Sequence, residues 1–234
     1  MVSINDVRET VLAICNKNNY GYISPDDFNL YAKQAQLEVF DSYMDIYNKY
    51  LNMQKQHMSG DDVADLAARA KESVEAFITG ATLNYVAPSA GLSNFEIPSN
   101  SYYIINVQYG TTTFIDVEKV KYTDVFRLIN SNLTAPTEAN PVYVQGEANI
   151  GVAPSSIISD ISVFYVRYPL DPLWDYVTLT NGEPMYNAAG SQDFEVHKED
   201  EPTLVNKILE KAGLSIREVE VYKTAAVNDN QQQQ

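Results

Sequence analysis

Apolar residues recur at three- and four-residue spacing through the first eighty positions of the chain. The first such stripe consists of Ile4, Val7, Val11 and Ile14, and Ser3 precedes it as a candidate N-cap. This spacing predicts a first helix with one buried face.

A long second helix is predicted from Ser24 onward. Ser24-Pro25-Asp26-Asp27 provides a cap, a proline at the first helical position and acids in the first turn. No Gly or Pro follows until Gly60, so the helix is expected to run about thirty residues, or roughly 45 Å. Its apolar residues form two stripes: Phe28, Tyr31, Ala32, Ala35, Val39, Tyr43, Ile46 and Tyr50, and Leu30, Leu37, Phe40, Met44 and Leu51. Two stripes favour a second face covered by neighbouring subunits, although a helix central in its own bundle has the same pattern.

The pattern then changes from helices to strands. A third helix is expected from Asp61 to Gly80, with Val74 and Phe77 facing inward. From Ala81, β-branched and aromatic runs predict strands, paired as hairpins at two Gly-containing turns. The expected hairpin strands are 102–108 and 111–117 around Tyr109-Gly110, and 142–145 and 148–152 around Gly146-Glu147. Residues 160–168, apolar on both faces, are expected to form a central strand, and 122–130 a short helix.

The last third is less regular. After Pro169 and Pro172 the expected features are a turn at Asn181-Gly182 and a helix from Glu201 to Ala212 that Gly213 ends. The low-complexity end, AAVNDNQQQQ, is expected to be a docking tail. The predicted fold is α+β. It comprises a helical bundle with a long helix hairpin in 1–80, an antiparallel β-sandwich or barrel-like domain in 81–180, and an irregular segment, C-terminal helix and extended tail in 181–234.

The charge balance argues against several classes of partner. The net charge is −15, and residues 1–80, 81–180 and 181–234 are each net −5. Without a basic patch, tight nucleic-acid binding and docking to an anionic membrane are not expected. The single cysteine, Cys15, has no partner for an internal disulfide, and neither a secretion signal nor a bilayer-length apolar run is visible. These features predict a chain made and folded in a reducing cytoplasm.

The stretch NKNNYGYISPDDFNLY, residues 16–31, is similar to a calcium-binding loop. Gly21 falls in the glycine position of an EF-hand, but Asn16, Asn18 and Tyr20 occupy ligand positions and the closing acid is Asp27. One carboxylate in the usual positions leaves the charge of the ion largely uncompensated. The stretch is therefore interpreted as a turn that leads into the long helix, and no metal site is predicted.

Catalytic motifs are absent from the sequence. His57 and His197 lie in different regions, and the nucleophile-elbow, P-loop and dinucleotide-binding patterns do not occur. The paired carboxylates of glycoside hydrolases leave no local sequence motif, so this activity stays open. Trp174 beside Tyr176 could stack on a sugar, although a core or interface position is favoured for these two aromatic residues. The prediction is no enzyme, no catalytic residue and no cofactor.

The abundance of tyrosine points to protein interfaces. The chain contains 17 Tyr residues, a residue type that provides large contact area at low entropic cost. Contacts with other chains are predicted for the long helix, through Tyr31, Phe40 and Tyr43, and for the tail from Val227 to Gln234.

Three stretches resemble virion proteins of tailed bacteriophages. FEIPSNSYYIINVQYG, followed by VYVQGEANIGVAPSSIISDISVFYVRYPLDPLW, resembles the β domain of head-to-tail connectors, with Val152-Ala153-Pro154 and Tyr165-Val166-Arg167-Tyr168-Pro169 at the positions of their strand-end and exit motifs. The segment GYISPDDFNLYAKQAQLEVFDSYMDIYNKYLNMQ and residues 193–234 are similar to the opening helix and the end of virion ring proteins from crAss-like phages. The first helix hairpin is longer than in the connectors of short-tailed phages.

The resemblance implies a structural subunit of the virion. Such proteins form a ring, commonly of twelve copies, beneath the portal protein, where they join capsid to tail and surround the channel used in genome ejection. The implied partners are further copies of the chain, the portal protein and adjacent connector or tail proteins, with DNA passing unbound, no membrane, and assembly in the host cytoplasm. An alternative is a receptor- or carbohydrate-binding virion module.

Overall fold

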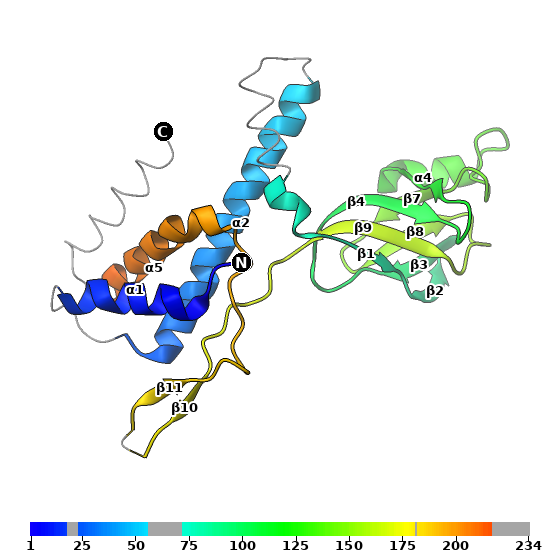
Figure 1. The fold of residues 1–234 in the computed structure, drawn as a ribbon. Coiled ribbons are helices and arrows are strands. Elements are labelled where there is room, and N and C mark those ends of the chain that lie inside the picture. Colours follow the sequence, from blue (N-terminus) through cyan, green and yellow to red (C-terminus); the bar gives the residue numbers. More distant parts are fainter. Residues whose placement is uncertain (18–22, 56–71, 181, 217–234) are drawn as a thin grey trace. The chain divides into compact units, whose positions relative to one another are not determined.

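A computed structural model describes residues 1–17, 23–55, 72–180 and 182–216. They divide into two compact units, one formed by Met1–Val74 with Pro169–Gln234 and the other by Glu75–Tyr168. The protein is α+β, as predicted (Figure 1). From the sequence we expected boundaries near residues 80 and 180. In the structure the second unit begins at Glu75 and ends at Tyr168, and the C-terminal segment belongs to the same unit as the N-terminal helices.

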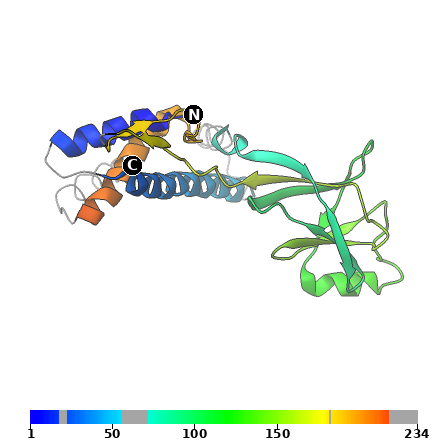
Figure 2. The ribbon, with the colours of Figure 1, turned by 90° about the horizontal axis from the view of Figure 1, so that it is seen from below.

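Three helices form the framework of the first unit. They are α1 (Ile4–Lys17), α2 (Pro25–Lys55) and α5 (Glu201–Ile216), with the short 3-10 helix η1 (Lys198–Asp200) before α5. Helix α5 contacts both α1 and α2 (Figures 1 and 2). The buried apolar residues of these helices include Val7, Val11, Phe28, Ala35, Phe40, Met44, Leu204 and Ile208. The core of this unit therefore lies among segments from both ends of the chain.

The predicted start of α2 is confirmed. The Ser24 hydroxyl accepts a hydrogen bond from the Asp27 amide at 3.1 Å and donates one to the Asp27 carboxylate at 2.6 Å. The side chain thereby satisfies an amide that has no partner within the helix. From this cap the helix continues for 31 residues, close to the predicted length.

The second apolar stripe of α2 is partly covered by its own unit. Phe40 and Met44 are buried, Leu37 is half-buried and Leu30 is exposed. The alternative of a helix central in its own bundle therefore applies to the middle of α2.

Gly213 was predicted to end helix α5, but the helix continues to Ile216. Gly213 and its neighbour Ala212 are both buried. A glycine inside a helix costs only about 1 kcal/mol relative to alanine, so tertiary packing overrides the local stop signal. Helix α5 is further held to α2 by Lys207 and Lys211, which both form ion pairs with Glu38.

Two sheets and one helix make up the second unit. One sheet has the order β1-β9-β4-β5 and the other β2-β3-β8-β7-β6. The elements are β1 (Ile78–Thr82), β2 (Tyr85–Ser89), β3 (Leu92–Glu96), β4 (Ser101–Tyr109), β5 (Ile115–Asp116), β6 (Glu118–Lys119), α4 (Tyr122–Ile129), β7 (Val142–Gln145), β8 (Asn149–Ala153) and β9 (Ile161–Arg167). All neighbours pair antiparallel except β6 with β7. Strand β9 lies between β1 and β4, which confirms its predicted central place.

One core joins the two sheets. Phe95, Ile150 and Val152 of the five-stranded sheet belong to the same buried cluster as Val107 and Val163 of the four-stranded sheet. Val142 and Val144 form a second cluster with Val125 of α4, since successive residues of β7 point to opposite faces of its sheet. Helix α4, predicted from its spacing, thus packs on the five-stranded sheet.

Two predictions about strands are corrected. The third helix was expected to end at Gly80, but β1 has already begun at Ile78, and the described part of that helix is residues 72–75, with 61–71 outside the described residues. Gly80 pairs with Phe164, whose ring atom Cε1 would lie 3.1 Å from a Cβ at this position. Pairing with β9 therefore decides the conformation. The loop of the hairpin that follows Tyr109 is also longer than expected, because β5 begins at Ile115 and not at Thr111.

Candidate functional site

The C-terminal segment contains a two-stranded hairpin with an exposed apolar face. Strands β10 (Tyr176–Thr178) and β11 (Pro184–Tyr186) pair antiparallel, with Val177 opposite Met185 and Tyr176 opposite Tyr186. The hairpin extends beyond the helices of its unit (Figure 1). An isolated two-stranded hairpin is at best marginally stable in water, so its conformation needs support.

That support comes from Trp174 at the base of the hairpin. Its indole is 2% exposed and stacks on the rings of Tyr176 and Tyr186, at centroid distances of 5.6 and 5.8 Å. The guanidinium of Arg8 lies over the same indole. The stack fixes one face of the hairpin to α1 through aromatic and cation–π contacts.

Side chains from α1 and α2 bind the backbone around Trp174. The Asn29 side chain accepts a hydrogen bond from the Trp174 amide at 2.8 Å and donates one to the Trp174 carbonyl at 3.2 Å. The indole nitrogen donates to Asn5 at 3.1 Å. The buried Gln36 donates to the Leu170 carbonyl and accepts from the Glu195 amide, which joins the two arms of the segment to α2.

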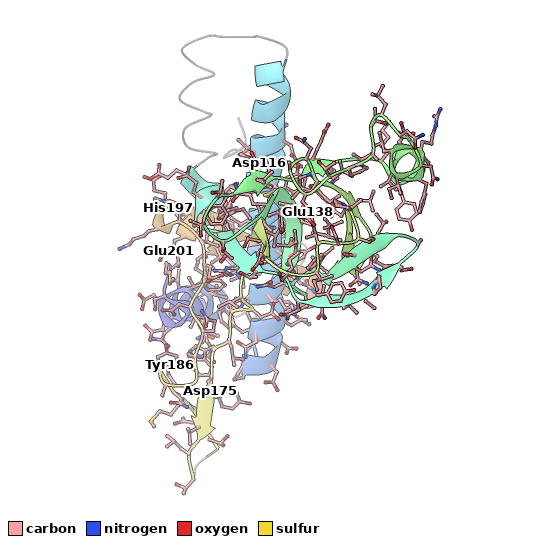
Figure 3. The ribbon with its side chains drawn as sticks, turned by 90° about the vertical axis from the view of Figure 1, so that its right-hand side faces the viewer. Asp116, Glu138, Asp175, Tyr186, His197 and Glu201 are labelled. Carbon is pink, nitrogen blue, oxygen red and sulfur yellow. The ribbon has the colours of Figure 1, made fainter. Side chains whose placement is uncertain are left out.

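A loop closes the other side of the base. Asn187 donates to the Asp175 carboxylate at 2.5 Å, and the Ser191 hydroxyl accepts from the Asp175 amide at 3.0 Å. Gly190 leaves room for this carboxylate, since a Cβ there would lie 2.2 Å from Asp175 Oδ2. Asp175 and Tyr186 are both labelled at the hairpin in Figure 3.

The opposite face of the hairpin is apolar and exposed. Val177 and Met185 are each 52% exposed and lie side by side across the strands. Leu173 and Leu179, which share the alternation of Val177, are exposed as well. We call Leu173, Val177, Leu179 and Met185, with Glu183 near the turn, the hairpin face. A ribbon whose aromatic residues are half-buried against the stack and whose aliphatic residues are exposed has the composition of a contact surface.

The segment that carries the hairpin has acidic residues but no basic ones. Segment 169–196 contains five acids and no Lys, Arg or His; the acids are Asp171, Asp175, Glu183, Asp193 and Glu195. Asp175, Asp193 and Glu195 accept hydrogen bonds from neutral amides, and Asp171 pairs with Lys33 of α2 at 2.6 Å. The segment therefore favours a partner surface with positive charge.

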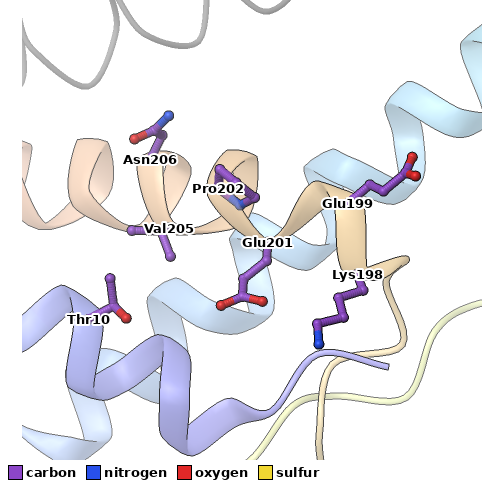
Figure 4. Close-up of a pocket in the computed structure, with 7 residues that line it drawn as sticks. All are labelled: Thr10, Lys198, Glu199, Glu201, Pro202, Val205 and Asn206. Carbon is purple, nitrogen blue, oxygen red and sulfur yellow. The ribbon is translucent and has the colours of Figure 1, made fainter.

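A second feature of this unit is an open depression of about 540 Å³ between α1 and α5 (Figure 4). It is lined by Thr10, Lys198, Glu199, Glu201, Pro202, Val205 and Asn206. Beside it, the His197 imidazole accepts a hydrogen bond from the Glu199 amide at 3.4 Å, with its Nδ1 3.9 Å from the Glu199 carboxylate. Both side chains are exposed, and the hydrogen bond places His197 as the cap of η1. This use of the imidazole is structural.

A buried tyrosine also lies near α5. The Tyr43 hydroxyl donates a hydrogen bond to the Asp200 carboxylate. Burial, and then this hydrogen bond and the charge of Asp200, raise the pKa of Tyr43 well above its ordinary value. The contact holds η1 against α2 and keeps the phenol neutral.

The predicted interface residues lie in different environments. Phe40 and Tyr43 are buried inside their unit, and Tyr31 is half-buried. Val227 and Gln234 lie outside the described residues. The contacts expected of these residues stay a prediction. Among the residues of this unit that the structure describes, the exposed large apolar side chains are the four aliphatic ones of the hairpin face and Met1, Ile14, Leu30 and Leu170. Trp174 is in the core, which is one of the two positions favoured from the sequence.

Sequence reasoning found the turn of the hairpin but not its strands. Asn181-Gly182 between β-branched and aromatic residues is a strong hairpin signal, and Gly182 has a φ of 86°. Of the calcium-like stretch, residues 18–22 lie outside the described part, while the Asp27 carboxylate is engaged by Ser24. Within the described residues, no group of three or more His, Cys, Asp or Glu could hold a metal ion.

Two further observations concern membrane-spanning helices and the similarity of this chain to known proteins. In the described ranges, no helix is both long and apolar enough to cross a membrane. A scan of protein-family models and a search of curated proteins both give no match to this chain.

Proposed function

We propose that this chain is a structural virion protein that forms a ring in the head-to-tail connector of a tailed bacteriophage. The proposal combines the resemblance of three sequence stretches with one structural observation, the hairpin face. An exposed apolar ribbon held rigidly at its base serves association with another protein surface. A head-to-tail contact of that kind, repeated between copies, gives a ring where the rotation between neighbours closes.

The charge distribution supports a place around a DNA channel. A net charge of −15, spread evenly along the chain, gives a surface that repels nucleic acid and lets DNA pass without sticking. In this proposal the ring contains twelve copies, lies beneath the portal protein, and contacts the portal on one side and connector or tail proteins on the other.

The alternative of a carbohydrate-binding module has less support. Sugar stacking needs an exposed aromatic platform, and Trp174, the residue considered for it, is buried under Arg8, Tyr176 and Tyr186. The stack is used to hold the hairpin.

The test is the rotational symmetry of native particles that contain this chain, obtained by averaging electron micrographs. Twelve-fold symmetry on the portal axis is the expected result. Three-fold symmetry, or a single copy in mature particles, would contradict the ring and would favour a receptor-binding module.

A further inference from the structure

The second unit carries a surface that is complementary to the hairpin face. It has only four basic residues, and Lys119, Lys121 and Arg127 are three of them, within nine positions of the sequence. Lys119 and Lys121 precede α4 and Arg127 lies in its last turn, while Tyr122 begins the helix and Leu133 follows its end. We call Lys119, Lys121, Tyr122, Arg127 and Leu133 the α4 face.

The packing of α4 explains why this surface is exposed. Val125 is fully buried in the cluster beneath the helix, so Thr123 and Arg127, on the other side of α4, face solvent. Tyr122 is 60% exposed, and its ring meets Phe126 edge to face at 5.8 Å. Leu133 is 94% exposed on a turn in which the Ser131 hydroxyl accepts hydrogen bonds from the amides of Leu133 and Thr134.

The charge of the α4 face is available to a partner. Lys119 donates a hydrogen bond to the neutral Gln145 side chain at 2.6 Å. Among the described residues, Lys121 and Arg127 form no ion pair. In the first unit, by contrast, Lys33, Lys207 and Lys211 pair with acids of their own unit. Positive charge and exposed apolar side chains therefore occur together at the α4 face.

We propose that the hairpin face of one copy of this chain docks on the α4 face of a second copy. The proposal rests on the proposed ring for its closure, and it names the two surfaces that join neighbouring subunits. Val177 and Met185 pack against Tyr122 and Leu133, and the acids around the hairpin meet the bases of α4.

Electrostatics favours a second copy as the occupant. Two copies with a charge of −15 each repel one another over most of their surfaces, so association needs a local reversal of sign. The hairpin segment has five acids and no base, whereas residues 118–127 at the α4 face have three bases and two acids, so the two charges are opposite in sign within a single sequence. The two faces are different surfaces of the chain, so the contact is heterologous and leaves one free face at each end until a ring closes.

The experiment is site-directed cross-linking of full-length chains. Val177→Cys in one preparation and Tyr122→Cys in another are mixed and treated with a short bismaleimide; the native Cys15 is buried. The expected product is a covalent dimer that contains one chain of each variant. Ala148→Cys, at an exposed turn of the same unit as Tyr122, replaces Tyr122→Cys in the matched control.

Charge reversal tests the polar part of the contact. Lys121→Glu with Arg127→Glu, added to the Tyr122→Cys chain, is expected to lower the cross-linking yield about tenfold, which corresponds to about 1.4 kcal/mol. Glu183→Lys in the Val177→Cys chain is expected to restore part of the yield. Recovery of this kind is not produced by misfolding of either variant.

Three results would overturn the proposal: a yield no higher than in the Ala148→Cys control, a cross-link that forms only when both cysteines are on one chain, or a yield unaffected by charge reversal. Failure of this contact and failure of the proposed function give different results. Twelve-fold particles without the cross-link would retain the ring and reject this contact, whereas the cross-link in particles without a ring would retain the contact and reject the connector.

Discussion

The Arg8 guanidinium lies over the Trp174 indole, with its Cζ 3.8 Å from the ring centroid. Arg8 is on α1 and Trp174 is at the base of the hairpin, so this contact joins the N-terminal helix to a segment near the other end of the chain. The other face of the hairpin is exposed, and its stability depends on this base.

We expect Arg8→Lys to lower the free energy of unfolding of the first unit by about 1 kcal/mol, because a lysine loses the planar stacking of the guanidinium on the indole. Trp174 is the only tryptophan of the chain, so its fluorescence during urea denaturation reports on this unit directly. Arg127→Lys, at an exposed position, is the matched control and is expected to change the stability by less than about 0.5 kcal/mol. Equal effects of the two substitutions would contradict the role of the stack.

Gly190→Ala is expected to destabilise the base of the hairpin by about 1–3 kcal/mol, because its Cβ would overlap the Asp175 carboxylate. The measurement is again urea denaturation followed by Trp174 fluorescence. In an Asp175→Ala background the same substitution is expected to cost clearly less, since the clashing group is absent. A cost that is the same in both backgrounds would show that the close approach is not its cause.

Tyr43→Phe is expected to lower stability at neutral pH by about 1.5–3 kcal/mol, because the hydroxyl donates to the charged Asp200. The pKa of Tyr43 is raised in the folded protein, mainly by burial. The phenol of Tyr43 therefore loses its proton first in the unfolded state, near pH 10. Above this pH the unfolded state is favoured, and the contribution of Tyr43 to the stability of the fold decreases. The stability difference between the wild type and Tyr43→Phe is expected to be constant below about pH 10 and to shrink above it. Calorimetric or urea unfolding at several pH values between 7 and 11 measures it, and a difference that stays constant to pH 11 would contradict the shift.

Ser24→Ala is expected to lower stability by about 1 kcal/mol, since it removes the cap of α2 and leaves the Asp27 amide without its acceptor. Ser42→Ala on the same helix is the control. Ser42 donates to the Val39 carbonyl and caps no amide, so its loss is expected to change stability by less than about 0.5 kcal/mol. Thermal or urea unfolding of both variants makes the comparison, and a similar loss for each would argue against the cap.

The sequence predicted most of the helices and the main strands, because their signals are local. The start of α2 depends on four consecutive residues, and β7, β8, β9 and α4 follow from periodicity in runs of four to nine residues. The absence of the nucleophile-elbow, P-loop and dinucleotide-binding patterns and the abundance of tyrosine were likewise read directly from the sequence.

Other elements were decided by contacts between distant parts of the chain. The local pattern predicts a helix for residues 78–80, but they form a strand because they pair with β9, and α5 passes through Gly213 because neighbouring residues are buried. Strands β10 and β11 are three residues each, too short for periodicity to predict, and they depend on Trp174.

The sequence by itself determined the fold class, the start of the long helix, the central strand and the even distribution of negative charge, since each follows from neighbouring residues or from a count. Only the tertiary structure decided which aromatic residues are core and which aliphatic residues are surface. Trp174 is buried because α1, far away in the sequence, covers its indole with Arg8 and accepts its hydrogen bond at Asn5, whereas Val177 and Met185 are exposed. The physical reason is that burial depends on which distant segments meet, and local patterns carry no information about that.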